Sequence, residues 1–254
     1  MNKKSKQTAI ITGGSTGIGK ATAAVFLEQG FNVVISGRNK TRGQRVAEML
    51  ADQHAGACHF IAADVGVEKE VKALIKDTIA KFGVLDVMVN NAGISGDQSG
   101  FLADSTTQNF EALFQTNILG LYFGMKYALI EMLAVKEGAI VNLASIAGMN
   151  GIPYSAQYCA SKHAVVGLTK AAAVEYAATG VRINAVAPGA VKTDILQAAI
   201  DAGSYSEESI AAMHPMQKMG RPADIANAIY YLGSDQSPFM TGSILMVHGG
   251  YNAV

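Results

Sequence analysis

Residues 8 to 19 read TAIITGGSTGIG, and this stretch decides the fold. A short run rich in β-branched residues leads into a turn that contains Gly13, Gly17 and Gly19, and the helical pattern KATAAVFLEQG follows it. Such a turn lets backbone N–H groups and a helix N-terminus face a phosphate, while the last glycine lets helix and strand pack closely. Because a strand precedes the glycines and a helix follows them, the sequence predicts a dinucleotide-binding βαβ unit here.

Strand and helix patterns alternate through the rest of the chain. Residues 69–82 and 223–232 place apolar residues three and four positions apart, which is typical of helices. The runs predicted to be strands are residues 8–12, 32–36, 59–63, 86–90, 139–144, 182–187 and 243–247. This alternation predicts an α/β fold, a doubly wound parallel seven-stranded sheet with helices on both faces, known as the Rossmann fold.

No linker or change of composition divides the chain. We therefore expect residues 1–254 to form a single dinucleotide-binding and catalytic domain. The segment at about 190–220 has the weakest periodicity, and we expect it to form an irregular or helical substrate lid over a site.

The charge balance argues against nucleic acid and anionic lipid as partners. The chain has 20 Lys and Arg residues and 20 Asp and Glu residues, so its formal net charge is zero and it has no long-range attraction for polyanions. A small-molecule substrate is expected instead. The chain begins without a signal-peptide pattern, and we expect no apolar run to be long enough to span a membrane. The sequence thus predicts a cytoplasmic protein that does not bind membranes.

Cysteine and histidine are sparse. Cys58 and Cys159 are the only cysteines, which is too few for a disulfide scaffold, so both are expected to be free and buried. The five histidines include no pair spaced to share a metal on one helix face, and no metal site is expected.

The residues after the second predicted strand bear on the choice of nicotinamide cofactor. An NAD site places a carboxylate there for the ribose 2′-hydroxyl, whereas an arginine accommodates the 2′-phosphate of NADP. The chain has Arg38 at this point and no acid between Ser36 and Lys40. Arg38, helped by Ser15 and Lys40, favours NADP(H). NAD(H) is the alternative, in which Arg38 is a solvated loop charge.

Residues 158–162 read YCASK and place a phenol and an ammonium one helical turn apart. No carboxylate occurs from Tyr158 to Val174, so Lys162 has no acidic partner nearby in sequence. We expect this ammonium to lower the pKa of Tyr158 from about 10 toward neutrality, which would suit it to general acid–base catalysis. The alternative is an ordinary amphipathic helix in which Tyr158 packs and Lys162 extends along the surface.

Two further polar residues lie at positions that indicate a site. Ser145 ends a predicted strand, and ligands of open α/β sheets bind at the carboxyl ends of strands. Asn117 lies on the apolar stripe of a helix predicted at about 107–134. A buried amide needs partners, so Asn117 is either a structural bridge or part of a polar network that reaches the site.

Together these motifs resemble the short-chain dehydrogenase/reductase family. Ser145 and Tyr158 are 13 residues apart, which fits that family, and the resemblance covers nearly the whole chain. The motifs that carry it are the glycine turn, Asp64-Val65, NNAG at 90–93, Asn117 within NILG, Ser145, Tyr158 with Lys162, Pro188-Gly189 and MHPMQKMGRPA at 213–223. The chain departs from the family's V-D-G-G pattern at His248, which we expect to be a tolerated surface or subunit-interface residue.

The resemblance implies a role for each catalytic residue. Tyr158 would be the general acid in carbonyl reduction and the general base in alcohol oxidation. Lys162 would bind the nicotinamide ribose, Ser145 would hold the substrate oxygen, and Asn117 would help to keep a water in a proton relay. It also implies a homotetramer. The predicted cofactor-binding residues are Gly13, Ser15, Thr16, Gly17, Ile18, Gly19, Arg38, Asp64, Val65, Asn91, Ala92, Gly93, Tyr158, Lys162, Pro188, Gly189, Val191 and Thr193.

The leading hypothesis is NADPH-dependent reduction of a neutral ketone or other carbonyl to a secondary alcohol, reversible as an alcohol dehydrogenase. The predicted pocket is mostly neutral or apolar and consists of Ser95, Gly96, Met149, Asn150, Ile152, Tyr154 and the lid. The alternative enzyme is a β-ketoacyl-thioester (acyl-carrier-protein) reductase, which would need a basic entrance, and the lid offers Lys192, Lys218 and Arg221. The non-enzyme alternative is a catalytically silent cofactor-sensing protein.

Overall fold

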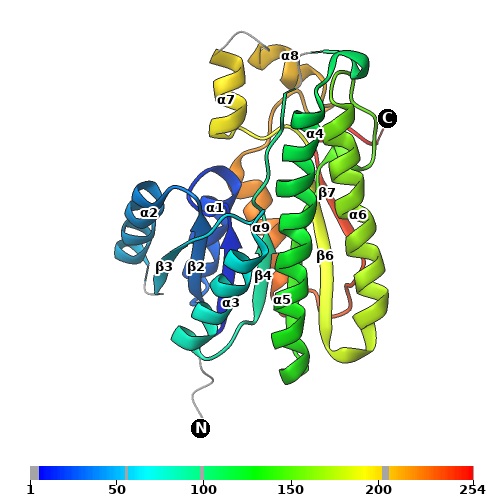
Figure 1. Cartoon of the computed structure of the whole chain (residues 1–254). Coiled ribbons are helices and arrows are strands. Elements are labelled where there is room, and N and C mark those ends of the chain that lie inside the picture. Colours follow the sequence, from blue (N-terminus) through cyan, green and yellow to red (C-terminus); the bar gives the residue numbers. More distant parts are fainter. Residues whose placement is uncertain (1–5, 55–56, 98–99, 202–205, 254) are drawn as a thin grey trace.

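The computed structural model describes residues 6–54, 57–97, 100–201 and 206–253 (Figure 1). Its centre is a parallel sheet of seven strands in the order β3-β2-β1-β4-β5-β6-β7. The strands are β1 (Thr8–Thr12), β2 (Asn32–Gly37), β3 (Cys58–Ala62), β4 (Val87–Asn90), β5 (Gly138–Leu143), β6 (Val181–Pro188) and β7 (Ile244–Val247). The predicted Rossmann sheet is confirmed, and every predicted strand agrees with the observed bounds to within one residue.

Helices cover both faces of the sheet. The helices are α1 (Gly17–Glu28), α2 (Lys40–Gln53), α3 (Glu68–Phe82), α4 (Thr107–Leu113), α5 (Gly120–Val135), α6 (Ala156–Tyr176), α7 (Asp194–Asp201), α8 (Glu207–Ala212) and α9 (Pro222–Gly233). A π-helical turn, η2 (Phe114–Leu119), joins α4 to α5, and short 3-10 turns are η1 (Leu102–Asp104), η3 (Ile146–Gly148) and η4 (Ala177–Thr179).

The two faces of the sheet have separate apolar cores, which explains why the central strands are buried on both sides. Ile10 of β1 packs in a core with residues of α3, α5 and α6, whereas its neighbours Ala9 and Ile11 pack in a core with residues of α1, α2 and α9. Successive side chains of a strand point to opposite faces. Since both faces of β1 are covered, each of its residues is buried.

The order of the strands fixes where a ligand can bind. The chain moves outward from β1 to β3, then crosses over β1 to β4 and continues outward to β7. β1 therefore pairs with β2 on one side and with β4 on the other. Ligands of open α/β sheets bind beyond the carboxyl ends of the strands at such a reversal. The segments at this place are the glycine turn after β1 and residues 91–93 after β4.

The predicted lid is helical where the structure describes it, and residues 202–205 lie outside the described residues. In Figure 1, α7 and α8 project at one end of the molecule, beyond the sheet. The two ends of this segment are tied to each other, because Val191 and Gly220 form a parallel bridge. Lys192 N–H donates to Gly220 O at 2.9 Å, and Gly220 N–H donates to Ala190 O at 2.9 Å.

The continuous helix Thr107–Val135 is long and apolar. Its 29 residues reach a mean hydropathy of 1.5 over an 18-residue window, which suffices by length and composition to cross a bilayer. The expectation that no run reaches this length is therefore wrong. The cause is packing: α5 lies against α3, β4 and β5, and 44% of that window is buried. A cytoplasmic location remains a prediction.

Cys58 and Cys159 are free and buried, as predicted. Burial raises the pKa of the Cys58 thiol to about 12, so the thiol stays protonated and unreactive at neutral pH. Among the described residues, no group of three His, Cys, Asp or Glu side chains could hold a metal ion.

Candidate active site

The glycine turn requires glycine at each end. Gly13 and Gly17 have φ of 65° and 49°, where other residues are strained. A Cβ on Gly19 would lie 2.3 Å from Gly13 O, so α1 can begin this close to β1 only without a side chain. Thr16, at the N-cap of α1, makes no capping hydrogen bond with its side chain, and the first turn contains no acid. The N–H groups of this helix end are thus available to an anion.

Hydrogen bonds join the turn after β1 to the turn after β4. The Thr12 hydroxyl oxygen accepts the N–H groups of Asn91 at 3.0 Å and Ala92 at 3.1 Å. The Asn91 side chain donates in return to Thr12 O at 2.8 Å and to Gly13 O at 3.3 Å. These side chain–backbone hydrogen bonds therefore fix the two turns relative to each other.

A cavity of about 360 Å³ lies in this crevice. It brings together residues that are far apart in sequence. The predicted site residues that line it are Gly13, Thr16, Gly17, Ile18, Gly19, Asn91, Ala92, Gly93, Ser145, Tyr158, Lys162, Pro188, Gly189, Val191 and Thr193. Residues that line it without having been predicted for the cofactor or the chemistry are Ile94, Ser95, Leu143, Ala144, Asp194 and Leu196. Ser15, Arg38, Asp64, Val65 and Asn117 lie outside its lining.

Tyr158 is half-buried in the cavity wall, and the Ser145 side chain is close enough to lower its pKa in part. Ser145 follows β5, and its Oγ accepts the Ala147 N–H at 3.1 Å, which caps η3. The cap fixes the serine side chain, and the tyrosine comes from the first turn of α6. The two side chains therefore line one cavity although they are 13 positions apart in sequence.

Lys162 is 6% exposed. Its Nζ donates to Leu143 O at 2.8 Å and lies 5.8 Å from the centre of the Tyr158 ring. Desolvation lowers the pKa of Lys162 to about 8, because burial disfavours the charged form.

The expected lowering of the Tyr158 pKa toward neutrality is wrong in direction. Burial raises the pKa of the Tyr158 phenol, and the hydrogen bond with Ser145 offsets only part of that effect. Desolvation of the phenolate is the largest cause of the raised pKa, and the lysine ammonium is directed to the carbonyl oxygen of Leu143.

Asn117 sits in the π-helical turn η2 and is 2% exposed. Its Oδ1 accepts the Ile94 N–H at 2.9 Å, and its Nδ2 donates to Ile94 O at 2.9 Å and to Ser161 Oγ at 3.0 Å. The structural bridge considered for this amide is confirmed: it ties the segment after β4 to α6. A role in holding a water stays a prediction.

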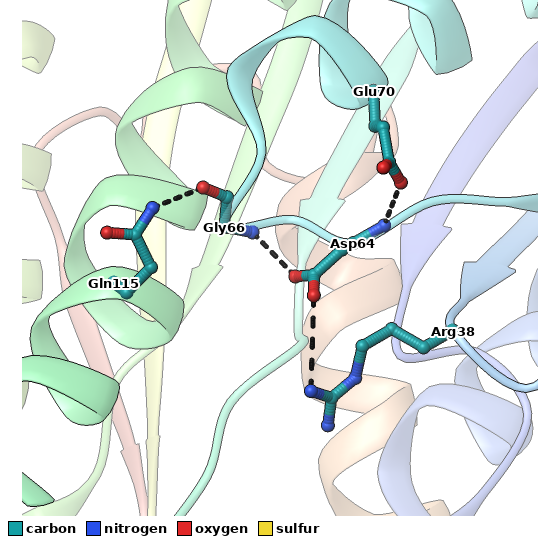
Figure 2. A network of polar contacts seen from close by, with 5 residues as sticks. All are labelled: Arg38, Asp64, Gly66, Glu70 and Gln115. Carbon is teal, nitrogen blue, oxygen red and sulfur yellow. Dashed lines mark hydrogen bonds and ion pairs between the residues drawn. The ribbon is translucent and has the colours of Figure 1, made fainter.

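Arg38 lies beside an acid that is distant from it in sequence. Arg38 Nη1 lies 4.0 Å from Asp64 Oδ2, and the two side chains are 70% and 38% exposed (Figure 2). The acid belongs to the loop after β3, which pairs beside β2, so it is near in space and distant in sequence. Ser15 lies at the same end of β2, since a Cβ on Gly37 would be 3.9 Å from its Oγ.

Comparison with known proteins agrees with this geometry. A family model described as "Enoyl-(Acyl carrier protein) reductase" matches residues 13–252. The chain belongs to the short-chain dehydrogenase/reductase family. It is 38% identical over 256 residues to 2,5-dichloro-2,5-cyclohexadiene-1,4-diol dehydrogenase of Sphingobium indicum, with 100% of both chains covered. It is 38% identical over 249 residues to 3-oxoacyl-[acyl-carrier-protein] reductase FabG of Staphylococcus aureus, with 97% of this chain and 98% of that protein covered.

A solved structure is similar as well. The structure "ElxO with NADP Bound" superposes with a TM-score of 0.92 at 47% identity and covers 98% of this chain and 100% of that one. The chain is thus an oxidoreductase of the short-chain type that acts on secondary alcohols or carbonyls.

His214 is a buried residue of this short-chain dehydrogenase/reductase that sequence reasoning missed. It is 1% exposed; its Nε2 accepts the Ala190 N–H at 3.1 Å, and its Nδ1 lies 3.0 Å from Ile210 O, to which it donates. A Cβ on Gly189 would lie 2.7 Å from Nε2, so the glycine admits the ring. His214 thereby fastens the loop after β6, which lines the cavity, to α8. Its only sequence signal is its place in the motif at 213–223.

The predicted substrate pocket is assembled only in part. Ser95 lines the main cavity, and Tyr154, which has a φ of 61°, lines a neighbouring cavity of about 210 Å³ that shares Tyr158. The other predicted pocket residues line neither cavity: Gly96, Met149, Asn150 and Ile152. Asn150, for example, accepts a hydrogen bond from the Asn252 side chain at 2.9 Å and so holds the C-terminal segment.

His248, where the chain departs from its family, supports a turn. Its Nδ1 accepts the Gly250 N–H at 3.1 Å. Gly249 and Gly250 have φ of 58° and 91°, so the turn needs glycine at both positions. A role for His248 at a subunit contact stays a prediction.

Proposed function

We propose that this short-chain dehydrogenase/reductase catalyses the reversible reduction of an uncharged ketone to a secondary alcohol with NADP(H), and that Tyr158 exchanges the proton. One observation carries the proposal. Tyr158 and Ser145 line the same cavity as the glycine turn and Lys162, and the serine side chain is close enough to act on the pKa of the phenol. Proton donor and dinucleotide cradle therefore open onto one space at the carboxyl end of the sheet.

The residues present fit a nicotinamide dinucleotide. Gly13 and Gly19 form a cradle that a Cβ would fill, and the first turn of α1 offers its N–H groups to the pyrophosphate. Arg38 would take the 2′-phosphate, which favours NADP(H) over NAD(H), and the relative ElxO has a structure with NADP bound. When bound, the nicotinamide supplies or accepts the hydride. Asn91, Gly93, Lys162, Val191 and Thr193 would hold that end.

The burial of Tyr158 suits a proton donor. Its raised pKa keeps the phenol protonated at neutral pH, so it can give its proton to an oxygen that becomes a much more basic alkoxide. Ser145 stands beside it to hold the same oxygen. In alcohol oxidation the phenol must first lose its proton, so we expect oxidation to be favoured at alkaline pH. The intact pair also argues against a silent cofactor-sensing protein.

The charges around the cavity support an uncharged substrate. Among the described residues that line it, the charged side chains are Lys162, whose ammonium donates to Leu143 O, and Asp194 at the start of α7. A strongly charged substrate would need a fixed opposite charge. The diol dehydrogenase relative, which is 38% identical, is named for a ring substrate without a charged group.

A β-ketoacyl-thioester reductase is the second candidate, since a FabG protein is 38% identical to the chain. An acidic carrier protein would require unpaired basic residues at the entrance. Two of the three lid cations are already paired, Lys192 with Glu207 and Arg221 with Asp224. This pairing favours the free ketone.

A screen with both cofactors tests the proposed function. Neutral ketones, secondary alcohols and β-ketoacyl thioesters would be compared at equal concentration, and turnover followed at the nicotinamide absorption band. We expect the highest kcat/KM for a neutral ketone with NADPH. Preferential turnover of the acyl thioester would establish the second candidate, and binding of NADPH without turnover of any substrate would support the silent protein.

We also propose a homotetramer assembled through helix pairing. Ile130 and Val135 of α5 are 54% and 57% exposed, and Phe110 and Phe114 at the start of the same long helix are 40% and 42% exposed. This apolar surface exceeds what the sheet covers, and a second copy would bury it. Light scattering of the purified protein would give the mass of the assembly, and a monomer would refute it.

A further inference from the structure

The π-helical turn η2 sends two polar side chains to two different parts of the site. Gln115 and Asn117 are two positions apart, and side chains with that spacing leave a helix on different faces. Asn117 holds Ile94 after β4 through both its amide atoms. Gln115 Nε2 donates to Gly66 O in the loop after β3 (Figure 2). π-Helical turns are frequent at functional sites.

The loop after β3 is closely fitted to this helix. A Cβ on Gly66 would lie 3.0 Å from Gln115 Cγ, and a Cβ on Gly120 would lie 2.8 Å from Val65 Cγ2. A Cβ at Gly120 would force Val65 to shift, and one at Gly66 would crowd the side chain of Gln115. Val65 itself is 8% exposed. The hydrogen bond from Gln115 therefore adds to the close packing between this loop and the helix.

Gly66 in turn orients the acid beside Arg38. Gly66 N–H donates to Asp64 Oδ1 at 2.9 Å, and Asp64 N–H donates to Glu70 Oε2 at 2.8 Å. The other oxygen of Asp64 faces Arg38 Nη1 at 4.0 Å. Figure 2 shows the resulting chain of contacts, from the helix through the peptide of Gly66 to the carboxylate and the guanidinium.

We propose that Gln115 is a positioning residue for the adenosine half of the cofactor. By holding Gly66 O, it fixes the loop whose Asp64 carboxylate sets the direction of Arg38, the group assigned to the 2′-phosphate. The same helical turn thus orders both ends of the cofactor groove, through Gln115 at one end and Asn117 at the other. The inference rests on the proposed NADP(H) binding and adds a residue that touches neither the cofactor nor the reacting atoms.

Binding of cofactor fragments tests this role apart from catalysis. Gln115→Met keeps the length of the side chain and removes the donor, and Gln115→Glu removes the donor with less change of shape. Gln108→Met, at an exposed glutamine of α4, is the matched control. The fragments are 2′-phospho-ADP-ribose, which lacks the nicotinamide, and reduced nicotinamide mononucleotide, which lacks the adenosine. Titration calorimetry measures the dissociation constant of each.

We expect both Gln115 variants to raise the dissociation constant of 2′-phospho-ADP-ribose about 3- to 10-fold, which is the effect of one lost hydrogen bond. The mononucleotide should bind as in the wild type, and kcat at saturating NADPH should stay within about 2-fold because the reacting groups are untouched. Thermal melting should match that of Gln108→Met, since Gln115 is exposed.

Three outcomes would overturn the inference. Unchanged binding of 2′-phospho-ADP-ribose by both Gln115 variants would remove the positioning role alone. Equal weakening of both fragments would show a general loss of structure in place of a local one. Failure of the wild type to bind 2′-phospho-ADP-ribose would overturn the cofactor assignment, and this inference with it.

Discussion

The glycine turn after β1 and the polar cluster around Tyr158 line the same cavity but are built in different ways. The turn is made by neighbours in sequence: Gly19 packs on the carbonyl of Gly13, six residues before it. The cluster is made by distant partners, because Tyr158 meets Ser145 and Lys162 donates to Leu143 O. The turn thus depends on the absence of side chains, whereas the cluster depends on polar groups delivered by separate elements.

The difference has a practical meaning for substitutions. Adding an atom to the turn should disturb structure and cofactor binding together, since the backbone has no room for it. Removing an atom from the cluster should disturb chemistry and leave the fold in place, since the apolar cores lie elsewhere. Each of the following predictions tests either the turn or the polar cluster.

The largest effect is expected at the phenol. Tyr158→Phe removes the proton donor and keeps the ring, so kcat should fall about 10²- to 10⁴-fold, with the affinity for NADPH nearly unchanged. Steady-state kinetics and fluorescence titration of NADPH measure the two quantities. Turnover that survives this substitution would exclude Tyr158 as the general acid.

Gly19→Ala should test the turn. The new Cβ would lie 2.3 Å from Gly13 O and 2.6 Å from Asn91 Nδ2, and overpacking of this kind costs about 1–3 kcal/mol. We expect a lower free energy of unfolding in urea and weaker NADPH binding. Gly167→Ala is the control, because Gly167 lies at an exposed position of α6 and a Cβ there meets nothing within 4 Å. The free energy of unfolding of this variant should be unchanged or higher. Equal behaviour of the two variants would contradict the close packing.

Arg38→Ala should weaken the binding of NADPH and leave the binding of NADH nearly unchanged. A charge-assisted hydrogen bond to the 2′-phosphate contributes about 1.5 kcal/mol or more, so KM for NADPH should rise about 10-fold. KM for NADH should stay close to the wild-type value, because NADH lacks that phosphate. Kinetics with both cofactors give the ratio, and an equal change in both KM values would remove the assignment of Arg38.

The buried Lys162 should make the free energy of unfolding depend on pH. Its pKa falls from 10.5 to about 8 in the fold, so between these values the unfolded chain binds more protons and stability rises with pH. Below about pH 8 both states are protonated and the cost of burying the charge is fully present. Relative to Lys162→Met, the wild type should gain about 1–2 kcal/mol between pH 7 and 9.5. Urea unfolding at both pH values measures the gain, and parallel behaviour of the two proteins would refute a depressed pKa.

The smallest effect on kinetics is expected at His214, which lies behind the residues that line the cavity. His214→Leu removes the acceptor for Ala190 N–H and the donor to Ile210 O, so the loop that carries Val191 and Thr193 should loosen. KM for NADPH should rise about 3-fold from one or two lost hydrogen bonds, with kcat little changed. His214→Gln, which can still accept from Ala190, should restore part of the affinity. No rescue by glutamine would indicate that the ring acts by packing alone.

Much of the fold and part of the site could be predicted because their signals are local. The strands have continuous apolar runs, and Gly13, Gly17 and Gly19 mark a turn that backbone sterics alone make specific. Tyr158 and Lys162 share a helix face by their spacing. In contrast, the acid beside Arg38 comes from the loop after another strand, and the partners of Gln115 and His214 lie 49 and 24 residues away.

By itself, the sequence determined the order of strands and helices, the place of the glycine turn and the identity of the polar groups proposed for proton transfer. Only the tertiary structure decided how those groups are charged and held: burial raises the pKa of Tyr158 and lowers that of Lys162. Covalent neighbours fix backbone geometry, whereas a pKa depends on solvent exclusion and on which dipoles lie within a few ångströms. Those distances exist only once the chain has folded.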